Sequence, residues 1–373
     1  MSREFDFLII GSGWYGAVCA RELTNKGYKC LVIEKRDHIG GNCYTEKKEG
    51  INVHKYGAHI FHTSDEYIWD YVKGFADFNN YRHHVVANYQ DELYSLPFNM
   101  WTFNKLWGVN TPEQARLKIE SQSFKGDVTN FEEQALSTLG EEIYKKFVKG
   151  YTEKQWLKSA KDLPAFLIKR IPVRFTFDNN YFFDKFQGIP INGYTEIFDK
   201  LLNGIEVRLN NNYFDNREMF NSLAKNIIYT GPIDRYYDYK YGALEYRPLR
   251  FETETLDIEN YQGHSVVNYT SSEIPYTRII EHKHFNNDVS QRTIVTKEFP
   301  IPFSRESELF YPLNDITNQN IYNKYFSLSS HEEHVFFGGR LAEYKYYDQH
   351  QVIRAALDFV KEIESKSISK RID

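Results

Sequence analysis

Residues 5–16 read FDFLIIGSGWYG, an almost unbroken apolar run followed by a GxGxxG loop. Such a run is typical of a strand that is buried on both faces of a parallel sheet. We expect a helix from Ala17 to Asn25 with a cap at Gly27. A second buried strand is predicted over residues 28–33, ending at Glu34. This order of strand, glycine loop, helix, strand and acid predicts a dinucleotide-binding βαβ unit.

Each residue type in this unit has a physical role. Gly11 permits a tight turn, Gly13 lets the backbone approach a pyrophosphate, and Gly16 lets helix and strand pack closely. The helix N-terminus offers unpaired N–H groups and the positive end of its dipole to phosphates. Glu34 lies 23 positions after Gly11, the usual separation for an acid that accepts hydrogen bonds from ribose hydroxyls.

Glycines further along the chain favour FAD over NAD. Gly40, Gly41 and Asn42 follow Glu34 closely, and the pattern resembles the second glycine motif of amine-oxidase-like FAD enzymes. Residues 227–232 read IIYTGP and residues 336–340 read FFGGR, two more apolar strands that end in glycine. Because these segments are so widely spaced, we predict a discontinuous FAD domain into which other lobes are inserted.

The intervening segments predict two inserted lobes. Residues 98–160 have a helical pattern, with Thr111 as a cap and Pro112 at the first helical position. Residues from about 245 to 316 alternate apolar and polar positions, which suggests an antiparallel sheet. The predicted fold class is α/β, with a Rossmann-like, glutathione-reductase-like FAD domain, an inserted helical bundle and an antiparallel β-sheet domain. We assign residues 1–78, 191–243 and 317–373 to the FAD domain, 98–160 to the helical domain, and 79–97, 161–190 and 244–316 to the sheet domain.

Composition argues against several classes of protein. With 46 Lys and Arg against 51 Asp and Glu, the net charge of -5 does not suggest a nucleic-acid binder. The chain has no run of about 18 apolar residues, so no membrane span is expected. A strand begins at Phe5, which leaves no room for a signal peptide. The three cysteines form no CxxC pair, so disulfides and thiolate zinc sites are not expected. These features predict a cytoplasmic protein.

Further motifs resemble those of one enzyme family, the prokaryotic UDP-galactopyranose mutases. The resemblance extends along essentially the whole chain, and it is the combination of motifs that is specific. The stretches are HKYGAHIFH at 54–62, GYTEKQW at 150–156, RIPVRF at 170–175, DNNYF at 178–182, YTRIIEH at 276–282 and GRLAEYKYYD at 339–348.

The resemblance implies an isomerase that interconverts UDP-galactopyranose and UDP-galactofuranose. FAD would act as reduced FADH-, with NAD(P)H only as its reductant. N5 of the reduced flavin would form a covalent adduct with the sugar, without net redox change. The product would supply galactofuranose for surface polysaccharide. UDP-galactose and UDP are the expected partners, and members of the family commonly form homodimers.

The resemblance also implies roles for single residues. Arg170 and Arg278 would contact the diphosphate and position the sugar, and His59 would lie near the flavin ring; these are the predicted catalytic residues. The predicted cofactor-binding residues are Gly11, Gly13, Tyr15, Gly16, Glu34, Lys35, Gly41, Asn42, His59, Ile60, Asn212, Arg340, Asp348 and Gln349. The predicted substrate-binding residues are Tyr151, Thr152, Trp156, Arg170, Tyr181, Asn268, Arg278, Tyr311 and Tyr346.

Other interpretations stay open at this point. An FAD-dependent oxidase or desaturase of the amine-oxidase-like class would share residues 11–42 but would need neither arginine. A nucleotide-sugar-binding module without catalysis is a third hypothesis, since fold does not prove chemistry.

The histidines raise a separate question. A metal site on His59 and His62, or on His282 and His284, would need further ligands at suitable spacing, so no metal is predicted. His83 and His84 occupy a region where the family has an asparagine near the substrate. Their role, and whether UDP-N-acetylgalactosamine is accepted, stay undecided.

Overall fold

The amino-terminal βαβ unit has the predicted form. In a computed structural model that describes residues 3–372, β1 (Phe5–Ile10) leads through the glycine loop to α1 (Trp14–Asn25) and β2 (Cys30–Ile33). The helix begins three residues earlier than Ala17 because Gly13 itself is the N-cap, and the second strand is two residues shorter than predicted. Lys26 and Gly27 end α1 with backbone hydrogen bonds to Leu23 and Thr24.

A five-stranded parallel sheet surrounds this unit. Its order is β16-β10-β1-β2-β9, and every neighbouring pair is parallel. The three further strands are β9 (Glu206–Arg208), β10 (Ala224–Tyr229) and β16 (Val335–Phe337). The segments around 227–232 and 336–340 therefore return to this sheet, where β10 pairs with β1 and β16 pairs with β10, as their apolar, glycine-terminated pattern indicated.

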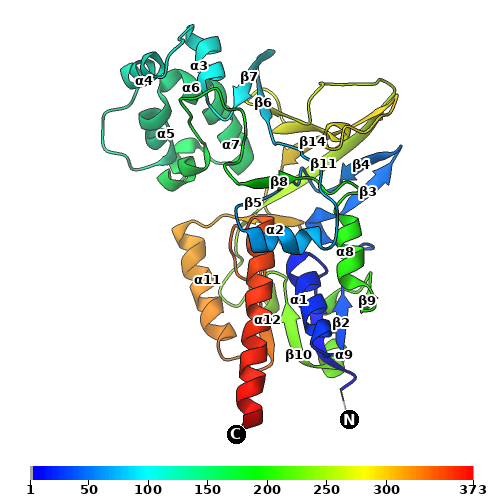
Figure 1. The fold of residues 1–373 in the computed structure, drawn as a ribbon. Helices are drawn as coiled ribbons and strands as arrows, with labels where there is room; N and C mark the ends of the chain where they lie inside the picture. The colour runs from blue at the N-terminus through cyan, green and yellow to red at the C-terminus, as the bar shows by residue number, and fades with distance from the viewer. Residues whose placement is uncertain (1–2, 373) are drawn as a thin grey trace.

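Helices cover both faces of the parallel sheet (Figure 1). On one face, α1 packs against α8 (Thr195–Leu202) and against the long α12 (Gln349–Ile372), and α12 in turn contacts α2 (Glu66–Lys73). The other face carries α9 (Arg217–Leu223) and α10 (Ile233–Tyr236), and α11 (Ile316–Ser329) packs beside α10 and β16. The buried side chains between these layers form two separate apolar cores, one on each face of the sheet.

A helical lobe lies at the top of Figure 1. Thr111 caps one of its helices through the Gln114 N–H, and Pro112 occupies the first turn, as predicted. Just before the last helix, residues 144–149 form a π-helical turn. The elements are α3 (Met100–Trp107), α4 (Pro112–Ser121), α5 (Phe131–Leu139), α6 (Glu141–Ile143), η2 (Tyr144–Lys149) and α7 (Gly150–Trp156).

A seven-stranded sheet lies between the helical lobe and the parallel sheet. Its order is β15-β11-β14-β13-β12-β6-β7, antiparallel except for the parallel pair β12 and β6. The strands are β6 (Val85–Tyr89), β7 (Glu92–Leu96), β11 (Tyr246–Leu256), β12 (Val266–Tyr269), β13 (Arg278–Glu281), β14 (Thr293–Pro300) and β15 (Leu309–Pro312). The predicted fold class is confirmed, and the division into three lobes stays our proposal.

Smaller elements connect the lobes. β3 (Thr45–Lys48) pairs with β4 (Ile51–His54), and β5 (Phe61–Thr63) pairs with β8 (Phe186–Gly188). Short turns complete the chain: η1 (Gly41–Cys43), η3 (Ala160–Asp162), η4 (Ala165–Arg170), η5 (Tyr213–Asp215) and η6 (His282–Phe285). Within residues 3–372, none of the helices combines the length and apolarity that a bilayer crossing requires.

Substitution of Gly16 tests whether the glycine loop needs a residue without a side chain at this position. A Cβ at Gly16 would lie 2.0 Å from the Gly11 carbonyl oxygen, whereas a Cβ at Gly13 would meet nothing closer than the Gly41 Cα at 3.9 Å. We therefore expect Gly16→Ala to lower the free energy of unfolding by about 1–3 kcal/mol, since a backbone atom must move. Gly13→Ala, the matched control, should cost less than about 1 kcal/mol. Urea unfolding of the flavin-free proteins measures both, and equal losses would refute the packing role of Gly16.

Candidate active site

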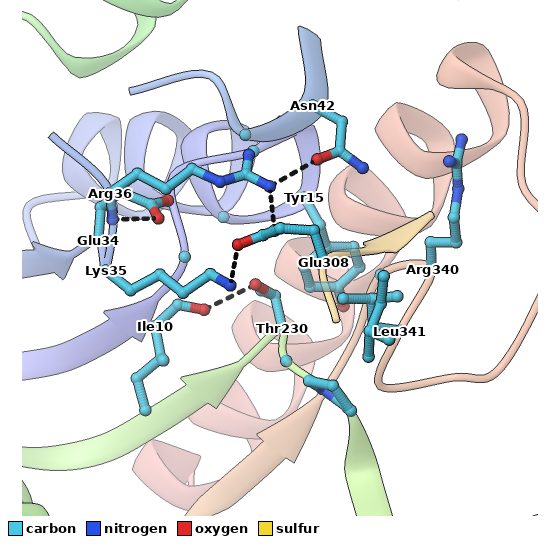
Figure 2. Close-up of a pocket in the computed structure, with 18 of the residues that line it drawn as sticks. Ile10, Tyr15, Glu34, Lys35, Arg36, Asn42, Thr230, Glu308, Arg340 and Leu341 are labelled. Atoms are coloured by element: carbon cyan, nitrogen blue, oxygen red, sulfur yellow. Dashed lines mark hydrogen bonds and ion pairs between the residues drawn. The ribbon is translucent and has the colours of Figure 1, made fainter. Parts of the chain in front are cut away.

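A cavity of about 670 Å³ opens where β1, β2 and β10 end (Figure 2). This is the edge of a parallel sheet at which dinucleotides bind. Ile60 and Asp348 are absent from its described lining residues. The predicted cofactor residues that line it are Gly11, Gly13, Tyr15, Gly16, Glu34, Lys35, Gly41, Asn42, His59, Asn212, Arg340 and Gln349.

The acid at the end of β2 is held rigidly. Glu34 is buried, with 6% of its surface exposed. One carboxylate oxygen accepts hydrogen bonds from the Ser12 N–H at 3.0 Å and the Ser12 hydroxyl at 2.8 Å, and the other accepts from the Arg36 N–H at 3.1 Å. These bonds fix the carboxylate beside the glycine loop, where a ribose would need an acceptor.

The glycine loops leave room for a close-approaching group. Gly13 lines the cavity, and a side chain there would project into open space rather than into the protein. Gly41 lies directly opposite, so close that its own Cβ would stand 3.1 Å from the Gly13 Cα. Gly13 at the start of α1 and the facing Gly41 in η1 provide the bare backbone that a pyrophosphate requires. The residues present therefore fit a dinucleotide cofactor.

One wall of the cavity comes from a segment that sequence reasoning missed. Residues 305–308, between β14 and β15, line the cavity together with Arg235 and Tyr239. As Figure 2 shows, the Glu308 carboxylate reaches across to Lys35 at 2.7 Å and to Arg36 at 2.6 Å. No local pattern around residue 305 signals this role, because the contact joins positions more than 270 residues apart.

Several predicted cofactor residues also have structural partners. The Tyr15 ring packs where a Gly338 side chain would be, 2.0 Å from the position of its Cβ. Arg340 donates hydrogen bonds to the carbonyls of Tyr347 at 2.7 Å and Phe310 at 3.2 Å. Gln349 accepts from the Trp14 indole at 2.9 Å and donates to the Ile60 carbonyl at 3.3 Å. Ile60 thus contacts the cavity lining through Gln349 but is not itself among the lining residues.

His59 presents a neutral imidazole to the cavity. Burial lowers the pKa of His59 to about 4; the Gly57 carbonyl acts to raise this pKa, and the Arg340 guanidinium acts to lower it further. Nδ1 donates to the Gly57 carbonyl at 2.8 Å, which leaves Nε2 with the lone pair at neutral pH.

Arg278 and Tyr151, two of the predicted substrate-binding residues, contact each other. The Arg278 guanidinium donates to the Tyr151 hydroxyl at 2.7 Å, and its Nε lies 3.5 Å from the Glu298 carboxylate. Burial lowers the pKa of Arg278, but Glu298 and Tyr151 outweigh burial and raise it on balance, so the group stays charged. Thr152 is buried beside Tyr151. The side chain of Arg170, the other predicted catalytic arginine, lies outside the described residues.

A second arginine in this region, Arg247, was not predicted. Its guanidinium lies 4.8 Å from the Trp156 ring centre and 4.9 Å from that of Tyr311. Tyr311 stacks on Tyr346 at 4.8 Å and also faces the Arg340 guanidinium at 4.9 Å. Arg247, the second residue of β11, lies directly opposite Tyr311 on β15. This cluster thus joins three of the predicted substrate residues to a predicted cofactor residue.

Among the described residues, Arg247 carries a buried charge without a counter-ion. Only 9% of its surface is exposed, and its Nε is buried with no hydrogen-bond partner. Within the described part of the chain, no carboxylate forms an ion pair with it. A buried cation of this kind is costly unless an anion compensates it. The site is therefore built to receive negative charge.

The remaining predicted substrate residues lie on the neighbouring strand and loop. Asn268 on β12 is opposite Arg278 on β13, and its side-chain oxygen is buried without a hydrogen-bond partner. Tyr181 lies edge-on to the His83 ring at 5.4 Å, and its N–H donates to the His83 carbonyl at 2.7 Å. His83 is buried, whereas His84 is exposed.

The histidine pairs considered for a metal each have local partners. His62 bonds to Asp184 at 2.6 Å, and His282 bonds to the Thr296 hydroxyl at 2.7 Å. The structure does bring His62 close to Asp348 and His350, with possible ligand atoms within 4.8 Å of one another. Asp348 directly precedes α12. That the protein holds no metal stays a prediction.

Fold and site together define an enzyme built on a Rossmann-like dinucleotide domain, and residues 9–75 match the family model described as an NAD(P)-binding Rossmann-like domain. The chain belongs to the UDP-galactopyranose mutase family, whose model matches residues 146–346, more than half of its length. This membership favours the mutase interpretation over the oxidase and the non-catalytic module.

Individual relatives agree with this assignment. The chain is 41% identical to the dTDP-fucopyranose mutase of Escherichia coli, over 94% of this chain and 96% of the relative. It is 39% identical to a probable UDP-galactopyranose mutase of Klebsiella pneumoniae, over 96% and 95%. A crystal structure of reduced UDP-galactopyranose mutase has the same fold, with a TM-score of 0.73 and 15% identity over 97% of this chain and 96% of that one.

Buried neutral histidines predict acid sensitivity. Burial lowers the pKa of His83 to about 3, with the Arg278 charge as the next cause, and burial lowers the pKa of His59 to about 4 and of His282 to about 3. The unfolded chain, with histidine pKa near 6.5, binds more protons than the fold between pH 6.5 and 4. Stability must therefore fall as the pH falls through this range.

The histidine at 83 allows a paired test. His83→Asn should make the fall in unfolding free energy shallower by up to about 1.4 kcal/mol per pH unit, because one proton-uptake site is removed. His84→Asn changes an exposed side chain and should leave the slope unchanged. Urea unfolding at several pH values measures the slopes. Identical slopes for His83→Asn and the parent protein would show that His83 is not held neutral.

Proposed function

We propose that this protein interconverts UDP-galactopyranose and UDP-galactofuranose, with bound FAD in its reduced form as cofactor. The observation that carries the proposal is a pair of guanidinium groups, the buried Arg247 and the part-buried Arg278, on the antiparallel sheet. Arg247 has no carboxylate partner among the described residues, and Arg278 has only Glu298. A diphosphate supplies the missing negative charge, and guanidinium groups suit its oxygens geometrically.

The chain's own residues would divide the work of binding. Arg278 and Arg247 would grip the diphosphate, and the Tyr311 and Tyr346 hydroxyls could donate to phosphate oxygens without adding charge. The unpartnered oxygen of Asn268 offers an acceptor to the ring N–H of a uracil. Tyr181 would supply an aromatic face to the base. Fixing the nucleotide in this way would orient the sugar toward the cavity that His59 lines.

The cofactor would supply the nucleophile. Gly13, Glu34 and Gly41 would hold the FAD, which when two-electron reduced would supply a nucleophilic N5 for displacement of UDP without net redox change. The protein contributes a neutral His59 beside the cavity, and the Arg278 and Arg247 charges would stabilise the departing UDP.

A second candidate substrate follows from one comparison. The relative from Escherichia coli is named a dTDP-fucopyranose mutase, and a dTDP-sugar carries the same diphosphate as a UDP-sugar. The arginine cluster would bind both alike, so discrimination must come from contacts to the base and to the sugar. We propose that His83, which is buried beside Tyr181, makes such a contact.

The proposal extends to the compartment, the oligomeric state, the reductant and the use of the product. We propose that the enzyme works in the cytoplasm as a homodimer, draws electrons from NAD(P)H, and supplies galactofuranose for a surface polysaccharide. The support is the family membership, together with a composition that suggests a reducing compartment.

The reaction can be tested with purified protein. UDP-galactopyranose, and in parallel dTDP-fucopyranose, is incubated with and without dithionite, and the products are separated by chromatography. We expect ring contraction of the UDP-sugar only with reduced flavin, and no reductant consumed per turnover. Turnover that needs no reduction, or oxygen uptake with an amine, would contradict the proposal.

Arg278→Ala and Arg170→Ala should abolish turnover but keep the yellow flavin, and loss of flavin from both would show that they serve the cofactor instead.

A further inference from the structure

Lys154, inside the GYTEKQW motif, makes a contact that the proposed chemistry does not use. Its ammonium group donates to three backbone carbonyls, those of Tyr269 at 2.7 Å, Ile274 at 2.9 Å and Tyr276 at 3.0 Å. An ammonium has three N–H donors, so all are satisfied. The acceptors lie in or beside residues 270–277, which connect β12 to β13 and are called here the β12–β13 turn.

A second contact lies one helical turn away on α7. A Cβ at Gly150 would stand 2.6 Å from the Thr270 carbonyl oxygen and 2.9 Å from the Ser272 nitrogen. Only glycine permits this approach of the helix backbone to the β12–β13 turn. The π-helical turn over residues 144–149 ends at this point, and such turns are frequent near functional sites. Helix α7 thus contacts the turn at Gly150 and, four residues later, at Lys154.

Helix α7 and the strand that follows the β12–β13 turn each carry residues of the proposed substrate site. Helix α7 bears Tyr151, between the two contacts, and Trp156, while Arg278 begins β13 directly after the turn. The hydrogen bond of 2.7 Å from Arg278 to the Tyr151 hydroxyl joins the two elements. A shift of α7 would separate this pair and would also move Trp156 from the Arg247 guanidinium.

We infer that Lys154 is a positioning residue, which holds α7 against the β12–β13 turn so that Tyr151 and Arg278 meet in the geometry that binds the diphosphate. This inference rests on the proposed function for its catalytic consequence. The physical basis is that one ammonium group satisfies three carbonyls at once, one at the end of β12 and two in the turn. Removing the ammonium takes this shared donor away and frees the turn to move.

The contact should weaken in alkali. Burial lowers the pKa of Lys154 to about 8, and no charged side chain contributes to this shift. The phenols nearest in sequence to the acceptor carbonyls, Tyr269 and Tyr276, have pKa values raised by burial, to about 12 for Tyr269, so neither ionises in this range. A neutral amine has two N–H donors and cannot satisfy three carbonyls. The arrangement is therefore complete below pH 8 and lost as the pH rises above it.

The test compares Lys154→Met, which keeps the length of the side chain but removes the charge, with Lys149→Met, an exposed lysine just before α7. Both proteins are studied with bound, reduced flavin. We expect kcat/KM for UDP-galactopyranose to fall about 100-fold in Lys154→Met, since small misplacements cost that much. The flavin content should not change. The loss of activity above pH 8 in the parent protein should be absent from the variant, and Lys149→Met should match the parent.

Two further measurements keep the inference falsifiable. Gly150→Ala, which leaves the ammonium intact, should reproduce the loss of kcat/KM. Amide hydrogen exchange over residues 270–277 should be faster in Lys154→Met than in Lys149→Met, and this readout needs no substrate. Unchanged exchange, or parental kcat/KM and pH profile in Lys154→Met, overturns the inference. An inactive parent protein refutes the proposed function instead, while exchange still reports the contact.

Discussion

A buried guanidinium without a carboxylate partner is the constraint on which the site depends. Arg247 lies between the rings of Trp156 and Tyr311, and no described acid neutralises it. The aromatic faces attract the cation but recover only part of the cost of taking it out of water. Structural arginines in protein interiors are normally paired. An unpaired one, beside a partly neutralised Arg278, is best explained by a ligand that brings negative charge.

Each of the three proposed lobes supplies part of this arrangement. The helical lobe contributes Tyr151 and Trp156 from α7, the antiparallel sheet contributes Arg247 and Arg278, and the segment after β16 contributes Arg340. Because Arg340 faces Tyr311 and also lines the dinucleotide cavity, the charge cluster and the cofactor site share a wall. The proposed diphosphate site and the proposed cofactor site are therefore adjacent, which is the geometry that the proposed reaction between sugar and flavin would need.

The fold was largely accessible from the sequence, and the site only in part. The βαβ unit could be predicted because a buried strand, Gly11, Gly13 and Gly16 each satisfy a local backbone requirement. The capping of α4 by Thr111 is local in the same way.

Arg247 and Glu308 could not be found from the sequence, since their roles depend on strand pairing and on contacts between distant segments. Residues 161–190 were assigned to a sheet, yet their only strand is β8, which pairs with β5. Roles for Tyr181 and Asn268 came from family resemblance, and the structure adds the unpartnered oxygen of Asn268.

The most direct test of the central claim is thermal unfolding of the flavin-bound protein and of Arg247→Met, each with and without UDP. Without UDP, the variant should be at least as stable as the parent, because an uncompensated buried charge has been removed. With saturating UDP, the parent should gain clearly more stability than the variant, since the diphosphate repays the cost of burying the arginine. If Arg247→Met destabilises the ligand-free protein and UDP stabilises both proteins equally, Arg247 is an ordinary structural residue and the account is wrong.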